Sequence, residues 1–137
     1  MKGAGLDEQL DELGFSLGSV CEAIITTLDP EGSPSASPMG VIRIGPKKIE
    51  IKPFKTSSTY NNLLAHPRAC INITGDPALY LVTAFKHETF EGFGKPVVNE
   101  DLRLESSDAH VFVDVQESSD ISEIRSRFKC GVNSIEF

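Results

Sequence analysis

Apolar and β-branched residues recur along much of the chain in short runs that favour strands over helices. The pattern predicts four strands in the first half of the chain, over residues 20–28, 33–44, 48–52 and 68–74. The first three are separated only by Asp29-Pro30-Glu31-Gly32 and Gly45-Pro46, which are turn-forming segments. Because tight turns join antiparallel neighbours, we expect an antiparallel meander followed by a fourth strand.

Helical spacing of apolar residues predicts four short helices, over residues 6–13, 59–65, 78–85 and 118–128. Asp76 and Pro77 suit the N-cap and the first position of the third of these helices. That helix, from Ala78 to Phe85, is apolar on nearly every side, so we expect it to be deeply buried or covered by a partner.

The second half of the chain is harder to divide into elements. Residues 109–115 alternate as a fifth strand, whereas residues 87–108 are polar, contain several Gly and Pro residues, and are expected to be mostly loop. The final Ile135-Glu136-Phe137 has the character of an interrupted strand. With no internal repeat and no linker, the pattern predicts a single domain over residues 1–137, truncated at its C-terminal end.

Composition narrows the class of protein. The 137 residues are 39% hydrophobic and 24% charged, which is typical of a soluble globular domain. A net charge of −7 and a pI of about 4.9 argue against a general nucleic-acid binder. There is no apolar run of membrane-spanning length and no signal-peptide core, so we expect no membrane association and a cytoplasmic location. Three distant cysteines, Cys21, Cys70 and Cys130, do not suggest a disulfide framework.

The first candidate binding segment combines one ammonium group with a run of hydroxyls before the helix over residues 59–65. Its members are Lys55, Thr56, Ser57, Ser58, Thr59 and, one helical turn on, Asn62. A helix start presents unsatisfied N–H groups and a partial positive charge, which favour an anion such as phosphate. The alternative is that Ser58 or Thr59 simply caps the helix and that Lys55 is a solvated surface charge.

The second candidate segment is the strand of small residues from Ser33 to Val41. Pro34 and Pro38 each remove a backbone donor from it. Such a strand, facing an anion-binding loop, is what a flat cofactor with a phosphate tail requires. The alternative is an edge strand that its prolines protect from pairing.

No set of catalytic residues is visible. His66 ends a predicted helix, and neither His87 nor His110 has a carboxylate or cysteine at a characteristic spacing. There is no nucleophile elbow, no phosphate-binding Walker loop and no metal-ligand motif, and Gly92-Phe93-Gly94 lacks the third glycine of a dinucleotide fingerprint. We therefore expect no catalytic residue and no metal site, and any redox chemistry would come from a cofactor.

The order of these segments resembles the FMN-binding split-barrel proteins. The similarity covers roughly residues 20–85 and rests mainly on Ala36-Ser37-Pro38-Met39-Gly40-Val41 and on Thr59-Tyr60-Asn61-Asn62-Leu63, with Ile71-Asn72-Ile73-Thr74 and Asp76-Pro77 after them. Within that group it is closest to a microbial branch known only as a domain of unknown function. It is more distantly similar to the flavin reductases of the same fold.

This resemblance implies a mainly β protein, a six-stranded antiparallel Greek-key split barrel with flanking helices. It implies FMN bound at a homodimer interface, with the phosphate near the segment from Lys55 to Asn62. The isoalloxazine ring would lie along the strand residues Ser37, Pro38, Met39, Gly40 and Val41. Backbone groups there can bond the polar edge of the flavin, and a soft Met side chain suits a flat ring.

The function expected from these observations is that of an FMN-dependent oxidoreductase or flavin reductase of unknown substrate, with NADH or NADPH as the reductant. The first alternative is a flavin carrier or redox sensor that uses the same site. The second is a cofactor-free interaction domain that binds partners through the apolar helix over residues 78–85.

Overall fold

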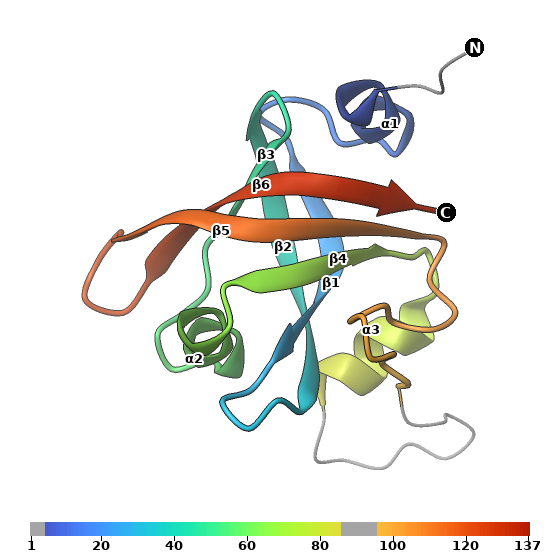
Figure 1. Ribbon diagram of the computed structural model, residues 1–137. Helices are drawn as coiled ribbons and strands as arrows, with labels where there is room; N and C mark the ends of the chain where they lie inside the picture. Colours follow the sequence, from blue (N-terminus) through green and yellow to red (C-terminus); the bar gives the residue numbers. More distant parts are fainter. Residues whose placement is uncertain (1–4, 86–95) are drawn as a thin grey trace.

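Six antiparallel strands close into a barrel in the order β1-β2-β3-β6-β5-β4 (Figure 1). The protein is described by a computed structural model that covers residues 5–85 and 96–137. In this part of the chain the strands are β1 Val20–Leu28, β2 Pro34–Gly45, β3 Lys48–Ile51, β4 Arg68–Ile73, β5 Ala109–Asp120 and β6 Ser126–Glu136. The chain passes from β3 to β4 beside β1, which confirms the expected Greek-key barrel.

Along each strand, side chains point alternately into and out of the barrel, and the inward-pointing ones fill its interior. Ile49 and Ile51 of β3 point inward and are fully buried, whereas Lys48 between the turn and Ile49 is exposed. The same period of two places Val111 and Val113 of β5 in the interior. The core therefore consists mostly of Ile and Val, residues that suit a pleated surface buried on one side.

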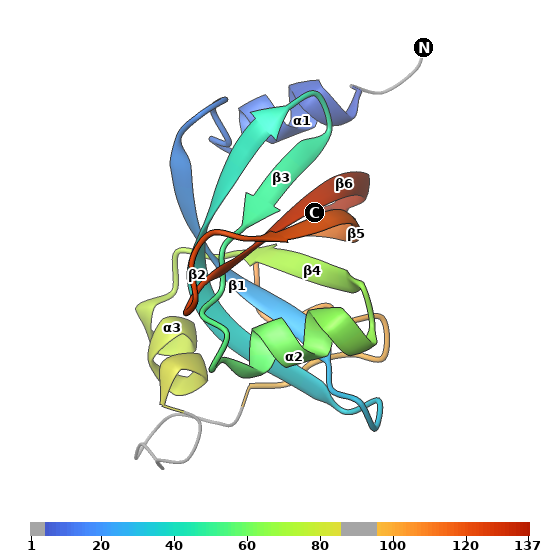
Figure 2. The same cartoon turned by 90° about the vertical axis from the view of Figure 1, so that its left-hand side faces the viewer.

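Three helices lie at the two ends of the barrel (Figure 2). They are α1 Leu6–Glu12, α2 Ser58–Ala65 and α3 Pro77–Ala84, and α1 lies at the end opposite to α2 and α3. No helix in the described ranges is long and apolar enough to cross a membrane. Helix α3 begins as predicted, because the Asp76 side chain accepts a hydrogen bond from the Ala78 N–H and Pro77 follows the cap.

Helix α1 is fastened to the barrel by Arg43 of β2. The Arg43 guanidinium contacts Asp11 at 2.5 Å and Asp7 at 3.0 Å, and it donates a further hydrogen bond to the Phe15 carbonyl. These charge-assisted bonds hold the helix while Leu10 and Phe15 enter the core. The predicted helix over residues 6–13 is thus confirmed to within one residue.

The helix predicted over residues 118–128 is wrong. Strand β5 continues to Asp120, and β6 begins at Ser126, so the segment forms a hairpin with its tip at residues 121–125. Ile121 and Ile124, whose spacing suggested a helix, are exposed at this tip. Pairing with β3 decided the outcome, because Phe128 and Cys130 enter the core only if the chain is extended.

A second, smaller apolar cluster lies outside the barrel, between α3 and the outer face of β1 and β2. Ile24 and Ala36 from the sheet are covered by Leu104, with Leu79 and Tyr80 of α3 packed against them. The loop prediction for residues 87–108 holds for the described part from residue 96, which contains only an isolated bridge. Residues 87–95 lie outside the described ranges.

The loop that carries Leu104 is bound to the barrel through the buried amide of Asn72. Its Oδ1 accepts hydrogen bonds from the Leu104 N–H at 3.0 Å and from His110 Nδ1 at 2.8 Å. Its Nδ2 donates to the Ile24 carbonyl at 2.9 Å and to Thr26 Oγ1 at 3.1 Å. The two acceptors on β1 require the NH2 group of the amide to face them, so its oxygen faces His110. Because that oxygen can only accept, His110 carries its proton on Nδ1.

Candidate functional site

The predicted strand of small residues, from Ser33 to Val41, supplies the part of β2 that is paired on one side only. Residues 34–42 pair with β1, but pairing with β3 begins at Val41 and involves only the upper half of the strand. Beyond Val41 and Ile51 the two strands separate, and the chain after β3 leads away into α2 (Figure 1). Within the described residues, the far edge of residues 34–40 therefore presents backbone groups that no other strand satisfies.

The two faces of this half of β2 contact different parts of the protein, and the size of each residue fits its contacts. Ala36 is buried against the α3 cluster, while Met39 and Val41 face the barrel core. A Cβ added at Gly40 would lie 2.7 Å from Val20 Cγ1, closer than real Cβ atoms approach. The glycine is thus required by its neighbour on β1. Ser37 and Pro38 are half-buried beside it.

The predicted hydroxyl-rich segment, from Lys55 to Thr59, is a tight turn that leads into α2. Ser57, rather than the predicted Ser58 or Thr59, is the N-cap, and its Oγ accepts from the Tyr60 N–H. The Ser57 N–H and Oγ–H both donate to the Phe54 carbonyl, at 3.0 and 2.6 Å. Capping thus occupies Ser57. The neighbouring residues Thr56 and Ser58 are exposed to solvent.

Thr59 and Asn62 face inward from α2. Both are almost fully buried, and Asn62 Nδ2 donates to Thr27 Oγ1 of β1 at 3.0 Å. Helix α2 packs on β1 and also contacts β2. The fold therefore brings the two predicted segments onto neighbouring elements, with Asn62 fixing the helix that starts at the hydroxyl-rich turn.

Lys55 is not a solvated surface charge. Its Nζ lies 2.9 Å from Asp120 Oδ2 at the end of β5, and its backbone N–H donates to the Ile124 carbonyl at 2.9 Å. The β5–β6 hairpin is thus joined to the turn before α2. Because Asp120 was placed on a helix by the sequence pattern, this contact was not foreseen.

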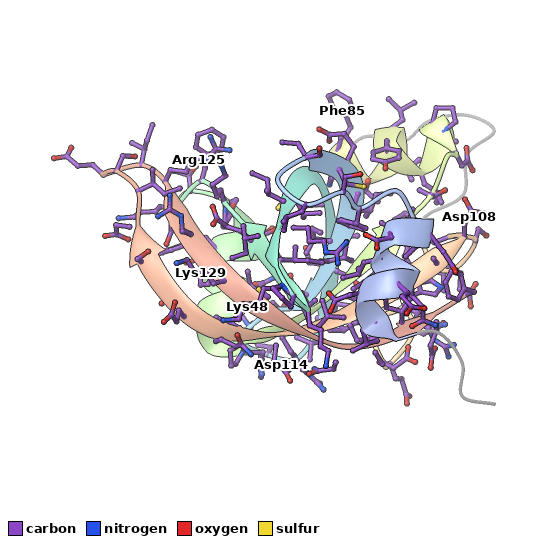
Figure 3. The ribbon with its side chains drawn as sticks, turned by 90° about the horizontal axis from the view of Figure 1, so that it is seen from above. Lys48, Phe85, Asp108, Asp114, Arg125 and Lys129 are labelled. Carbon is purple, nitrogen blue, oxygen red and sulfur yellow. The ribbon has the colours of Figure 1, made fainter. Side chains whose placement is uncertain are left out.

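Positive charge gathers where β3 and β6 pair. Residues 47–55 and 125–129 contain seven of the 13 lysines and arginines with a single acid, Glu50, in a chain of net charge −7. Lys48 and Lys129 lie along this strip, with Arg125 toward the hairpin end (Figure 3). Sequence analysis missed Arg125, and its only signal was that basic residues recur at every second position from 125 to 129, which is the period of a strand.

Among the described residues, His110, Cys70 and Cys130 are buried or half-buried and hydrogen-bonded inside the fold. Burial lowers the pKa of His110, whose Nδ1 is bound to Asn72. Burial raises the pKa of Cys70 and of Cys130 to about 12, so both thiols stay protonated. His66 ends α2 with its N–H on the Asn62 carbonyl, while His87 lies outside the described residues. Among those described, no group of His, Cys, Asp and Glu could hold a metal ion.

Comparison with solved structures shows the fold in several flavin-related proteins. An FMN-bound protein from Methanosarcina mazei, of family model DUF447, matches with a TM-score of 0.72 and 21% identity, over 93% of this chain and 65% of that one. The chain thus spans just under two thirds of that protein.

Two further structures are similar to the same extent. The 2-nitrobenzoate 2-nitroreductase of Pseudomonas fluorescens matches with a TM-score of 0.70 and 17% identity, over all of this chain and 74% of that one. The flavin reductase of the styrene monooxygenase from Pseudomonas putida S12 has a TM-score of 0.70 and 12% identity, over 93% and 85% of the two chains. At these identities the similarity shows a shared fold.

Comparison by sequence is more specific. No curated protein matches the chain. The family model for the N-terminal domain of the proteins of unknown function DUF447, however, matches residues 21–136, from the second residue of β1 to the last residue of β6. The chain therefore belongs to the DUF447 family and contains its N-terminal domain.

Proposed function

We propose that this chain binds FMN and acts as a flavin-dependent oxidoreductase. The observation that carries the proposal is the placement of a one-sided strand edge, residues 34–40, and an exposed hydroxyl turn on neighbouring elements. The fold supports it, because solved proteins with this fold include an FMN-bound protein and flavin reductases.

The residues around the start of α2 fit the phosphate of FMN. Exposed hydroxyls on Thr56 and Ser58, together with the N–H groups of the first helical turn, form a donor set suited to a dianion. Lys55 adds a cation, although Asp120 partly neutralises it. Ser57 and Asn62 would act indirectly, since one caps the helix and the other binds it to β1.

The edge of β2 fits the ring of a flavin. Backbone groups on the edge of β2 that β3 does not pair, from Pro38 to Gly40, would bond the polar edge of the ring. A bound FMN supplies the hydride and electron chemistry. The described residues near the site offer no acid–base pair, so in this proposal the protein binds, orients and shields the ring.

A spectrum of the purified protein, with identification of any released cofactor, tests flavin binding directly. Replacing Thr56 and Ser58 together by Ala should weaken FMN binding about tenfold or more while leaving riboflavin binding within about twofold, because only the phosphate loses partners. Asn61→Ala, an exposed change on the same helix, is the control. A protein that binds neither flavin would support the cofactor-free interaction domain.

Anaerobic bleaching of the bound FMN by NADH or NADPH, followed by turnover with an acceptor, separates an oxidoreductase from a flavin carrier. If the flavin reacts without a protein acid, His66→Asn and His110→Asn should each change the rate of reduction less than about tenfold, equivalent to roughly 1.4 kcal/mol. A thousandfold loss in either variant, with FMN still bound, would contradict this.

We further propose that the chain works as a homodimer. Leu79 and Tyr80 of helix α3 pack against the barrel but are only partly buried, Leu81 and Val82 are also partly exposed, and Phe85 is 50% exposed. An apolar surface of this kind is typical of a contact between subunits. Light scattering should give twice the monomer mass, and Phe85→Ser should lower the dimer fraction. A stable monomer that retains flavin would refute the proposal.

A further inference from the structure

The β5–β6 hairpin places Arg125 beside the turn that precedes α2. The backbone of Arg125 forms a bridge with Phe54, next to the bond from the Lys55 N–H to the Ile124 carbonyl. Phe54 is also the residue whose carbonyl accepts both bonds from Ser57, the N-cap of α2. Arg125 is distant in the sequence but thus lies next to the segment to which we assign the FMN phosphate.

The Arg125 side chain is held in place although it lies on the surface. Its Nε donates to the Lys52 carbonyl at 2.9 Å, and its guanidinium carbon lies 4.8 Å from the centre of the Phe54 ring. The Phe54 ring is itself 51% exposed. The ring contact and one hydrogen bond hold the guanidinium beside Phe54, and within the described residues its two terminal nitrogens have no hydrogen-bond or ion-pair partner.

Three of the six other cations in this strip each have an acidic partner, whereas Lys47, Lys48 and Lys52 form no ion pair with a described residue. Arg127 Nε lies 3.1 Å from Glu50, and Lys129 Nζ lies 3.9 Å from Glu117. Lys55 is 2.9 Å from Asp120. An anion that approached Lys55 would therefore also meet the carboxylate of Asp120, whereas Arg125 presents a positive charge with no nearby acid partner in the described residues.

We propose that Arg125 binds the phosphate of the flavin and makes the site select phosphorylated flavin over riboflavin. A guanidinium presents two parallel N–H groups that match two phosphate oxygens, and a fixed guanidinium loses little freedom on binding. The inference rests on the proposed FMN binding and adds a specific residue to it. In this arrangement Lys55 mainly anchors the hairpin to the turn.

The test compares the dissociation constants of FMN and riboflavin for the wild type and four variants by equilibrium dialysis. Arg125→Gln should weaken FMN about tenfold or more and leave riboflavin within about twofold. Arg125→Lys should fall between, because it retains the charge but lacks the paired donors. The control is Arg127→Gln, which makes the same charge change in β6, two residues after Arg125. It should leave the ratio of the FMN and riboflavin dissociation constants unchanged.

Two results would contradict the inference. If Arg125→Gln folds normally and its FMN-to-riboflavin ratio equals that of the wild type, Arg125 does not contact the phosphate, although FMN binding itself would stand. If Lys55→Gln removes the discrimination and Arg125→Gln does not, Lys55 has the role assigned to Arg125. A wild-type protein that binds neither flavin would instead refute the proposed function, and this inference with it.

Discussion

The substitution Asn72→Ala tests whether the buried Asn72 amide holds the loop that carries Leu104 against the barrel. Asn72 is fully buried, and its side chain bonds to groups on β1, on β5 and in the loop that carries Leu104. That loop covers Ile24 and Ala36, so the amide fixes the surface against which residues 34–40 of β2 rest.

The magnitude follows from the groups that the substitution leaves without partners. The Leu104 N–H is fully buried, so water cannot replace its lost acceptor, which costs about 1–3 kcal/mol. The Ile24 carbonyl loses a hydrogen bond worth about 0.5–1.5 kcal/mol, and His110, partly exposed, recovers some of its loss from water. We therefore expect a loss of about 3 kcal/mol, a large part of a domain's usual stability of about 5–15 kcal/mol.

Urea unfolding provides the assay. With a slope of about 2 kcal/mol/M, the expected loss lowers the midpoint by about 1.5 M. Asn133→Ala, which removes an exposed bond to Asp114 on the same barrel, should cost less than about 1 kcal/mol. A loss below about 1 kcal/mol in Asn72→Ala would show that the network does not hold the loop.

Three further outcomes are expected. Gly40→Ala should lose about 1–3 kcal/mol in urea unfolding, and Val20→Ala should restore most of it by removing the close contact; no rescue would refute that cause. Cys70 and Cys130 should resist a thiol reagent at pH 8 until unfolding, and rapid labelling would refute their burial. Because the folded His110 has a lowered pKa, the unfolded chain binds more protons, so stability should fall as pH drops below about 6.5. His110→Asn should flatten that dependence.

The first half of the fold could be predicted from the sequence because its signals are local. β-Branched residues placed β1, small residues and the turn at Asp29 to Gly32 placed β2, and Asp76-Pro77 placed the start of α3. The small-residue strand and the hydroxyl turn were likewise visible, since composition and short-range spacing define them. The six-stranded barrel itself entered through resemblance to a family and not through periodicity.

The second half depended on long-range contacts. Ile121, Ile124 and Phe128 fit a helix by spacing, yet the pairing of β6 with β3 and β5 requires an extended chain. For the same reason no local pattern could show that Asp120 neutralises Lys55. The sequence thus determined which segments carry the candidate chemistry, whereas barrel closure decided which charges meet there, because β3 and β6 are neighbours only in space.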